Sequence, residues 1–416
     1  MIKPKQHWIG VGIPISGPMF RREFTCDHPL TGATLLISGL GYHDAWINGK
    51  RVGDHVLDPS QTDYESRVFY VRHDVTKMLY GGPNALGVIL GNGWYNQDRV
   101  WGENGLSYGP PRLMAELHLT YADGTTGIIR ADTDWRWAPG PITDNNVYAG
   151  ECYDARLEID GWCLPGFDDS TWQAAVIMDP PGGELQEQIM PPMRRIDGLR
   201  PVNIDDREDG IYVVDFGQNF AGWCRIQVEG SGGTEITLRY AETVFPDGTL
   251  DTSTTGVFAT KVEQVDRYIC RGPCGQSTSQ HQQIRKVSTL DMSNYHGTAS
   301  HEKATVWPET WEPRFTYHGF RYVEVSGWPG DLRPENITGV IVHNDLPAVG
   351  RFECSDDRLN QLHRMALWTH RGNMHGIPED CPAREKCGWL GDANLVAEYS
   401  LWNYGGKTFW EKYLVS

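Results

Sequence analysis

The sequence predicts a multidomain protein in which two β-sandwich domains are followed by α-helices. Short apolar or alternating segments, separated by Gly, Asn and Asp turns, fill most of the chain up to residue 345, which is typical of β-sandwiches. Beyond that point the hydrophobic period changes to the 3.6 residues of a helix. A chain of 416 residues is also long enough for two or three domains that each have a core.

The first β-sandwich is expected to span residues 1–178. Residues 33–38 and 84–90 are apolar runs that predict buried strands. Between two further strand-like runs stands Asn48-Gly49, which supplies the positive φ angles of a type I′ turn and therefore predicts a hairpin.

The second β-sandwich is expected to span residues 179–345. Its first part, residues 180–192, is rich in Pro and Gly and predicts a linker or a strand-exchange segment. The strands expected after it are residues 212–216, 223–228 and 235–240. A polar insertion near residues 275–310 has little periodicity, so disorder or an error in the gene model is expected there.

Residues 346–416 carry the helical pattern. Ser355 is the expected cap of the first helix, whose apolar face includes Leu359. Thr408 and Glu411 are spaced as a capping box for the last helix. So few helices would leave a broad apolar face uncovered.

The densest group of chemically useful side chains lies in residues 376–393, where prolines predict a loop that leads into a helix. Its members include the carboxylates of Asp380, Glu385 and Asp392, the guanidinium of Arg384 and the indole of Trp389. Cleavage of a glycosidic bond requires two carboxyl groups with different protonation states. An arginine can hold a carboxylate through two hydrogen bonds, and an indole offers a flat face to a sugar ring.

The same residues also fit a purely structural role. Asp380 can cap a turn, Arg384 and Glu385 can form a surface ion pair, and Trp389 can belong to a core. The spacing alone leaves the catalytic and structural interpretations open.

The run DCPAREKCGWLGD, residues 380–392, resembles the active-site signature of bacterial and fungal α-L-rhamnosidases, glycoside hydrolase family 78. Residues 91–95 and 48–49 resemble the amino-terminal domain of that family, and residues 215–219 and 314–325 resemble its second β-domain. Residues 166–172 resemble the closing motif of galactose-binding-like sandwich modules attached to many glycosidases.

The resemblance implies that Glu385 is the general acid. It implies a rhamnose-binding subsite formed by Asp380, Arg384, Trp389 and Asp392. It further implies an (α/α)6 catalytic barrel that begins near residue 346, inversion at the anomeric carbon, and a general base, a Glu, expected beyond Ser416.

Two functions from different classes follow. The first is hydrolysis of terminal non-reducing α-L-rhamnose from a rhamnose-containing glycoside or oligosaccharide, in which the chain itself is expected to lack the base. The alternative is a non-catalytic carbohydrate-binding β-sandwich protein.

Composition excludes several partners. A formal net charge of −17 argues against nucleic acid and anionic membranes as partners, and no apolar run is long enough to span a bilayer.

No cofactor or metal is expected, because neither the nine cysteines nor His281, His296 and His301 have metal-site spacing. The start of the sequence shows no secretory signal, so a cytoplasmic location is expected, with secretion open if a leader is missing. Formation of a homodimer is also left open by the sequence.

Overall fold

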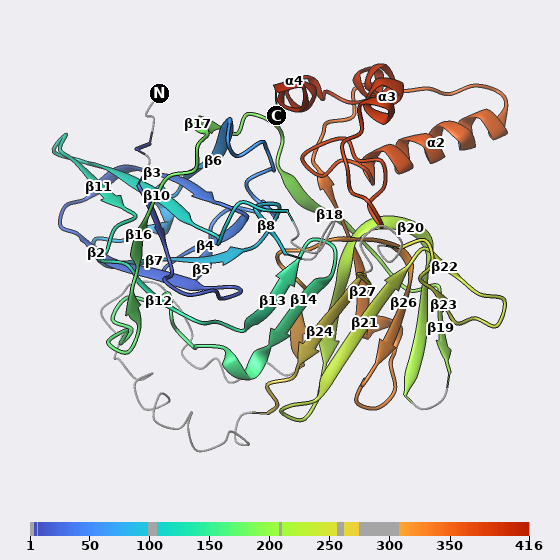
Figure 1. The fold of residues 1–416 in the computed structure, drawn as a ribbon, viewed down its shortest axis with the longest axis horizontal. Coiled ribbons are helices and arrows are strands. Elements are labelled where there is room, and N and C mark those ends of the chain that lie inside the picture. The colour runs from blue at the N-terminus through green and yellow to red at the C-terminus, as the bar shows by residue number, and fades with distance from the viewer. Residues whose placement is uncertain are drawn as a thin grey trace.

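The computed structural model describes residues 4–5, 7–98, 106–207, 210–255, 262–273 and 308–415. The polar insertion predicted near residues 275–310 lies outside this part of the chain except for its last three residues. The described residues are mostly β-structure, with three α-helices after the last strand (Figure 1).

The first β-domain consists of two sheets, as the sequence predicted. One has the order β16-β1-β10-β3-β6-β17, with β11 beside β10, and the other has the order β15-β12-β2-β7-β4-β5. The strands of the first sheet are β1 (Trp8–Gly10), β3 (Leu30–Gly39), β6 (Arg67–Asp74), β10 (Leu113–Tyr121), β11 (Thr126–Arg130), β16 (Val176–Met178) and β17 (Glu184–Glu187). Those of the second are β2 (Met19–Cys26), β4 (Tyr42–Ile47), β5 (Lys50–Arg51), β7 (Gly82–Gly91), β12 (Arg136–Ala138) and β15 (Gln173–Ala174).

Apolar side chains from both sheets meet in one core. Leu35 of β3 and Val88 of β7 are fully buried in it, on strands that belong to different sheets. The predicted hairpin is present, since β4 pairs with β5 and the φ angles of Asn48 and Gly49 are 51° and 77°. These angles are those that an Asn-Gly type I′ turn requires.

The second β-domain is one large sheet, where two stacked sheets were predicted. Its order is β13-β14-β24-β21-β26-β20-β27-β18, with β19 and β25 also paired to β20. The strands are β13 (Ile142–Asn146), β14 (Gly150–Asp154), β18 (Met193–Leu199), β19 (Asn203–Asp206), β20 (Ile211–Val228), β21 (Glu235–Ala241), β24 (Val265–Ile269), β25 (Glu309–Trp311), β26 (His318–Ser326) and β27 (Ile337–Asn344).

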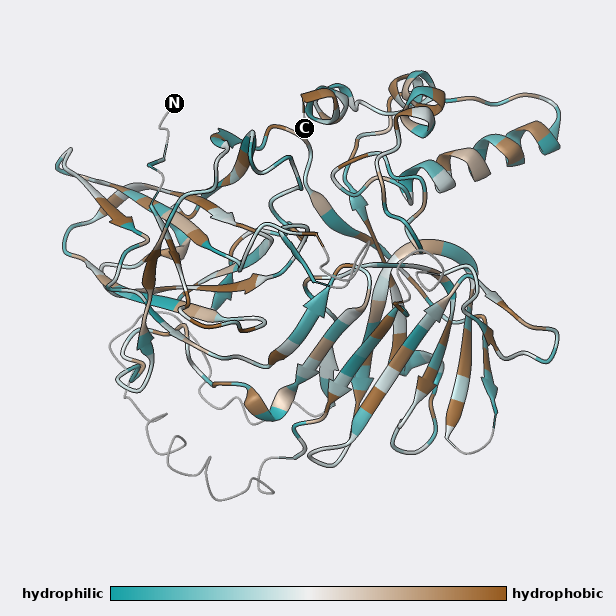
Figure 2. Cartoon of the chain, viewed as in Figure 1, coloured by the Kyte–Doolittle hydropathy of each residue, from teal (hydrophilic) through white to brown (hydrophobic). Residues whose placement is uncertain are grey.

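The long strand β20 explains why this sheet is continuous. It contains both predicted strands, 212–216 and 223–228, and its pairing with β26 shifts register between Asp215 and Phe220. Its first part also pairs with β19, whereas its last part pairs with β27 and β25. One strand therefore joins two parts of the sheet around a shared apolar core (Figure 2).

The two β-domains exchange strands near their junction. Strand β14 precedes residue 178, yet it pairs in parallel with β24 of the large sheet. Strand β17 follows that residue but pairs in parallel with β6 of the first domain. The sequence boundary between the domains stays a prediction, and strand pairing crosses it in both directions.

Short elements complete the described chain. They are β8 (Asn96–Gln97) with β9 (Leu106–Ser107), β22 (Thr243–Val244) with β23 (Leu250–Asp251), and the 3-10 turns η1 (Thr76–Met78), η2 (Ala155–Leu157) and η4 (Pro334–Asn336).

The α-helices are α2 (Asp357–Arg371), α3 (Leu390–Asn403) and α4 (Lys407–Val415). Both predicted caps are wrong. Asp356 caps α2 in place of Ser355, because its carboxylate accepts a hydrogen bond from the Arg358 backbone N–H at 3.0 Å. Thr408 already lies inside α4, so it cannot act as its cap. None of the described helices is long and apolar enough to cross a membrane.

Replacing Phe320 by Ala is expected to lower the free energy of unfolding by about 3–5 kcal/mol, because a large buried ring leaves a cavity. Phe320 is fully buried, and its ring centroid lies 4.3 Å from that of Phe220 and 4.7 Å from that of Tyr240. Urea unfolding followed by tryptophan fluorescence measures the loss. Phe245→Ala is the matched control, since that ring is 48% exposed; equal losses in both variants would contradict the packing argument.

Candidate active site

The acidic loop, residues 376–393, follows α2, includes the first turn of α3 and rests on strand β26 (Figure 1). A Cβ atom on Gly319 of β26 would lie only 2.8 Å from both the backbone nitrogen of Ala383 and Cγ of Pro382. Glycine at this position thus allows the loop to approach the strand. The Tyr148 hydroxyl donates to the Glu385 carbonyl at 2.7 Å, which adds a second anchor from another strand pair.

A buried polar network lies beneath the loop. The Tyr317 hydroxyl and Nδ1 of His375 both contact the Glu379 carboxylate, the latter at 2.9 Å. Nε2 of His375 is 2.8 Å from the Val342 carbonyl, and the His375 ring stacks on Tyr317 with centroids 4.3 Å apart. This network fixes the start of the loop against β26 and β27.

Lys386 is fully buried in the same network. Its ammonium group donates to the Tyr317 carbonyl and lies 3.9 Å from the centre of the Tyr317 ring. Burial lowers the pKa of Lys386 to about 7, although the nearby Glu379 carboxylate acts in the opposite direction. The side chains of Glu385 and Lys386 thus occupy very different environments, because Glu385 keeps contact with solvent.

Glu385 has a hydrogen-bond donor on each carboxylate oxygen. Nη2 of Arg384 donates to Oε1 at 3.0 Å, and Nε1 of Trp389 donates to Oε2 at 3.0 Å. The Glu385 side chain is 22% exposed, so it is held in place yet accessible from solvent. Such a carboxyl group can reach a bound molecule without leaving its partners.

Asp380 lies close enough to Glu385 for their charges to interact. Its Oδ1 accepts from the Cys387 backbone N–H at 2.9 Å, and its Oδ2 accepts from Sγ of Cys381 at 3.4 Å. Burial raises the pKa of Asp380, and the negative charge of Glu385 adds to the rise. Two neighbouring carboxyl groups with different environments are a common arrangement in acid-base sites.

The other predicted site residues are Asp392, Trp389 and Arg384, and they differ in how closely they approach Glu385 and Asp380. Asp392 lies exposed in the first turn of α3, and within the described residues no hydrogen bond or ion pair joins it to the other four. Trp389 is 52% exposed, so the interpretation of it as a core residue is wrong. Arg384 pairs with Glu385 at 3.0 Å, as the structural interpretation of the loop allowed.

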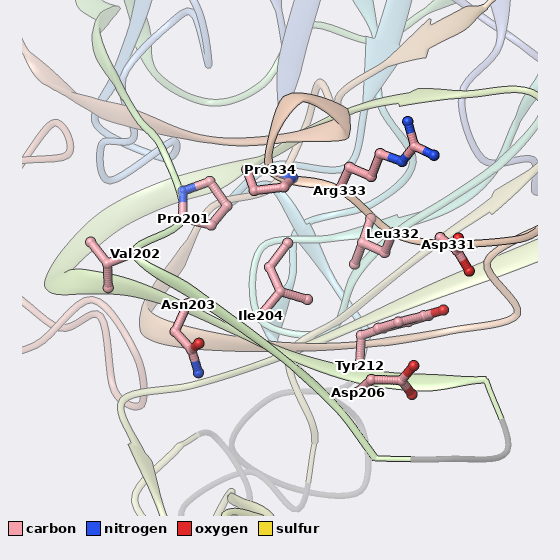
Figure 3. Close-up of a pocket in the computed structure, with 10 residues that line it drawn as sticks. All are labelled: Pro201, Val202, Asn203, Ile204, Asp206, Tyr212, Asp331, Leu332, Arg333 and Pro334. Atoms are coloured by element: carbon pink, nitrogen blue, oxygen red, sulfur yellow. The ribbon is translucent and has the colours of Figure 1, made fainter.

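A cavity elsewhere has none of these residues in its wall. Figure 3 shows the side chains that line it. Its lining residues are Pro201, Val202, Asn203, Ile204, Asp206, Tyr212, Asp331, Leu332, Arg333 and Pro334. The candidate site is therefore the open surface of the acidic loop.

Three family models match the chain one after another. The α-L-rhamnosidase N-terminal domain matches residues 28–197, and the bacterial α-L-rhamnosidase concanavalin-like domain matches residues 205–343. The six-hairpin glycosidase domain of bacterial α-L-rhamnosidases matches residues 347–416, which include the acidic loop. The chain belongs to the α-L-rhamnosidase family.

Relatives of this rhamnosidase-family chain are similar over nearly all of it. An α-L-rhamnosidase of Formosa agariphila is 38% identical over 401 residues, which are 95% of this chain and 39% of the relative. An α-L-rhamnosidase of Streptomyces avermitilis is 36% identical over 95% of this chain and 35% of its own length. The chain therefore spans well under half the length of these curated relatives.

Solved rhamnosidase structures agree with the fold. The α-L-rhamnosidase of Dictyoglumus thermophilum has a TM-score of 0.83 at 39% identity and covers 99% of this chain and 43% of its own. The Streptomyces avermitilis α-L-rhamnosidase complexed with L-rhamnose also has a TM-score of 0.83, at 36% identity over 96% of this chain and 36% of its own. Both matches extend across the β-domains of this rhamnosidase-family chain and its helices.

Proposed function

We propose that the whole protein hydrolyses terminal non-reducing α-L-rhamnose residues from α-L-rhamnosides, with inversion at the anomeric carbon. One observation supports this most directly. Glu385 presents a carboxyl group held on both oxygens, on a loop within the part of the chain that matches a six-hairpin glycosidase domain. The relatives that match are also named α-L-rhamnosidases.

In this proposal Glu385 is the general acid. Its carboxyl group donates a proton to the glycosidic oxygen while the bond from that oxygen to the anomeric carbon breaks. A water molecule attacks the opposite face of the sugar, and a general base takes up its proton. The base is a Glu that we expect outside the 416 residues of this chain; the curated relatives are long enough to contain such a residue.

The other loop residues bind the sugar. Asp380 and Asp392 accept hydrogen bonds from rhamnose hydroxyls, and their negative charge favours the oxocarbenium-like transition state. Trp389 has an exposed ring face that can stack on the sugar while its N–H stays on Glu385. Arg384 positions the general acid, because its guanidinium lies 3.0 Å from the Glu385 carboxylate.

The helices are proposed to begin an (α/α)6 barrel. Several of their large apolar side chains are exposed, namely Leu359, Leu362, Met365, Leu390, Leu395, Leu401, Trp402 and Leu414. An apolar surface of this kind is expected to be covered. Further helices of the same domain are the proposed cover, and the match to the six-hairpin model supports this.

Titration of the full-length protein with L-rhamnose tests the subsite. Asp380→Asn and Asp392→Asn are each expected to weaken binding about tenfold, because each removes a charged acceptor for a sugar hydroxyl. Asp27→Asn, on an exposed residue of the first domain, is the control and should bind as the wild type does. If both loop variants retained full affinity, binding would have to lie elsewhere, as the alternative of a carbohydrate-binding β-protein requires.

A further inference from the structure

Two imidazoles and one carboxylate come together at the junction of the two β-domains. His55, Asp58 and His73 offer ligand atoms that all lie within 4.8 Å of one another. Nδ1 of His55 is 2.6 Å from Oδ2 of Asp58, and the ring centroids of His55 and His73 are 5.2 Å apart. The mechanism proposed above uses none of these three residues.

Elements of both β-domains hold this His-Asp cluster in place. His73 lies on β6, and Asp58 forms a backbone bridge with His43 of β4. His55 forms a backbone bridge with Arg194 of β18, which belongs to the large sheet. All three side chains belong to the first domain, so an ion bound by the cluster would stabilise the loop through which that domain contacts β18.

The charge balance around Asp58 supports a bound cation. Its side chain is only 4% exposed, and burial of a carboxylate is costly unless a charge compensates it. The nearby guanidinium groups are engaged by other acids, since Arg51 pairs with Asp44 at 2.6 Å and Arg194 pairs with Asp54 at 2.9 Å. In the part of the chain that the structure describes, no Lys or Arg pairs with Asp58, and its ion-pair partner is His55, which carries a charge only when it is protonated.

Hydrogen bonds from outside the cluster hold the Asp58 carboxylate in a fixed orientation. Nε2 of Gln188 donates to Oδ1 of Asp58 at 3.2 Å, which leaves Oδ2 directed at the His55 ring. The Asp58 backbone carbonyl accepts from the His43 N–H at 2.8 Å. Outer contacts of this kind orient metal ligands in many proteins.

We propose that His55, Asp58 and His73 bind a divalent first-row transition metal ion, with Zn²⁺ as the best fit, and that the ion stabilises the loop through which the first β-domain contacts β18. Two imidazole nitrogens and a carboxylate oxygen suit Zn²⁺, whereas Ca²⁺ and Mg²⁺ prefer all-oxygen sites. Bonds of about 2 Å place the ligands of one tetrahedral ion about 3.3 Å apart. Side-chain shifts on the order of 1 Å bring the cluster to that geometry, with water as the fourth ligand.

No pattern in the sequence indicates a metal ion. His55 and Asp58 lie in a loop after β5, while His73 belongs to a strand much further along the chain. Only the pairing of β6 within the first domain brings the third ligand to the other two. Spacing along the chain therefore carries no recognisable metal-site signal.

Calorimetric titration of the chelator-treated intact protein with Zn²⁺ tests the proposal. The wild type is expected to bind one equivalent and to gain thermal stability, since a ligand that binds only the folded state stabilises it. His73→Ala should weaken binding at least a hundredfold and abolish the gain in Tm. Ca²⁺ should produce neither effect, and His28→Ala, at an exposed histidine of the same domain, should behave as the wild type.

Each result of these titrations either supports the metal site or overturns it. Absence of Zn²⁺ binding at micromolar concentration overturns the proposal, as does unchanged binding by both His55→Ala and His73→Ala. Asp58→Asn keeps the shape of the side chain and replaces the charge with an amide. If His73→Ala does not fold, a loss of Zn²⁺ affinity in Asp58→Asn supports the site and wild-type affinity rejects it.

Discussion

Glu385→Gln is expected to slow hydrolysis of an alkyl α-L-rhamnoside by about 10²- to 10⁴-fold, the usual contribution of a general acid. Gln keeps the length of the side chain and one acceptor oxygen for Arg384 or Trp389, which donate to Glu385 in the native site. It has no proton to give to the departing oxygen. The measurement is kcat of the full-length protein on a rhamnoside whose leaving alcohol is a poor leaving group.

A second substrate shows whether the lost group is an acid. The leaving group of a 4-nitrophenyl rhamnoside is 4-nitrophenolate, which departs with little need of protonation. The kcat of Glu385→Gln on this substrate should therefore fall much less than its kcat on the alkyl substrate. Glu353→Gln is the matched control, because that exposed carboxylate also pairs with an arginine, Arg351, at 2.6 Å. Equal losses on both substrates would assign Glu385 a role in binding or structure instead of proton transfer.

Local patterns were enough to predict two buried strands and one hairpin of the first domain. The apolar runs 33–38 and 84–90 lie within β3 and β7, and Asn48-Gly49 forms the expected turn. Strand alternation and turn chemistry depend on neighbours in sequence, so a single chain reveals them. Strand exchange between the domains depends on pairing between distant segments, and no local pattern encodes the partner of β14 or β17.

The turn after β7 contains Asn92 and Tyr95, residue types that can either bind a sugar or pack in the domain core. Their exposures are 6% and 2%, and Tyr95 stacks on Tyr108 with centroids 5.6 Å apart. Aromatic residues beside a glycine-rich turn thus serve the domain core here.

The candidate site was predicted only on its solvent side. The motif identified Glu385 and the side chains beside it, whereas the network of Glu379, Tyr317 and Lys386 was missed. Lysine and glutamate are almost always exposed, so sequence alone gives no reason to place them in a core. Tyr317 lies 62 residues before Glu379 in the chain, and the contact between them is visible only in the fold.

The buried amine of Lys386 is expected to make stability depend on pH in a specific window. Burial lowers its pKa from 10.5 to about 7. Below pH 7 the amine is protonated in both states, whereas between about pH 7 and 10.5 the unfolded chain binds more protons than the folded one. The free energy of unfolding therefore rises with pH in this window, by up to about 1.4 kcal/mol per pH unit.

Lys386→Met removes this rise, so the stability of the wild type relative to the variant should increase by about 2 kcal/mol from pH 7 to pH 9. Urea unfolding across that range measures the difference. The difference isolates Lys386, because Lys412, whose pKa burial also lowers to about 7, titrates in both proteins. Lys407→Met replaces an 83% exposed side chain and should follow the wild-type pH dependence. A Lys386→Met variant with the wild-type pH dependence would mean that the amine stays charged inside the fold, held by Glu379 and the Tyr317 ring.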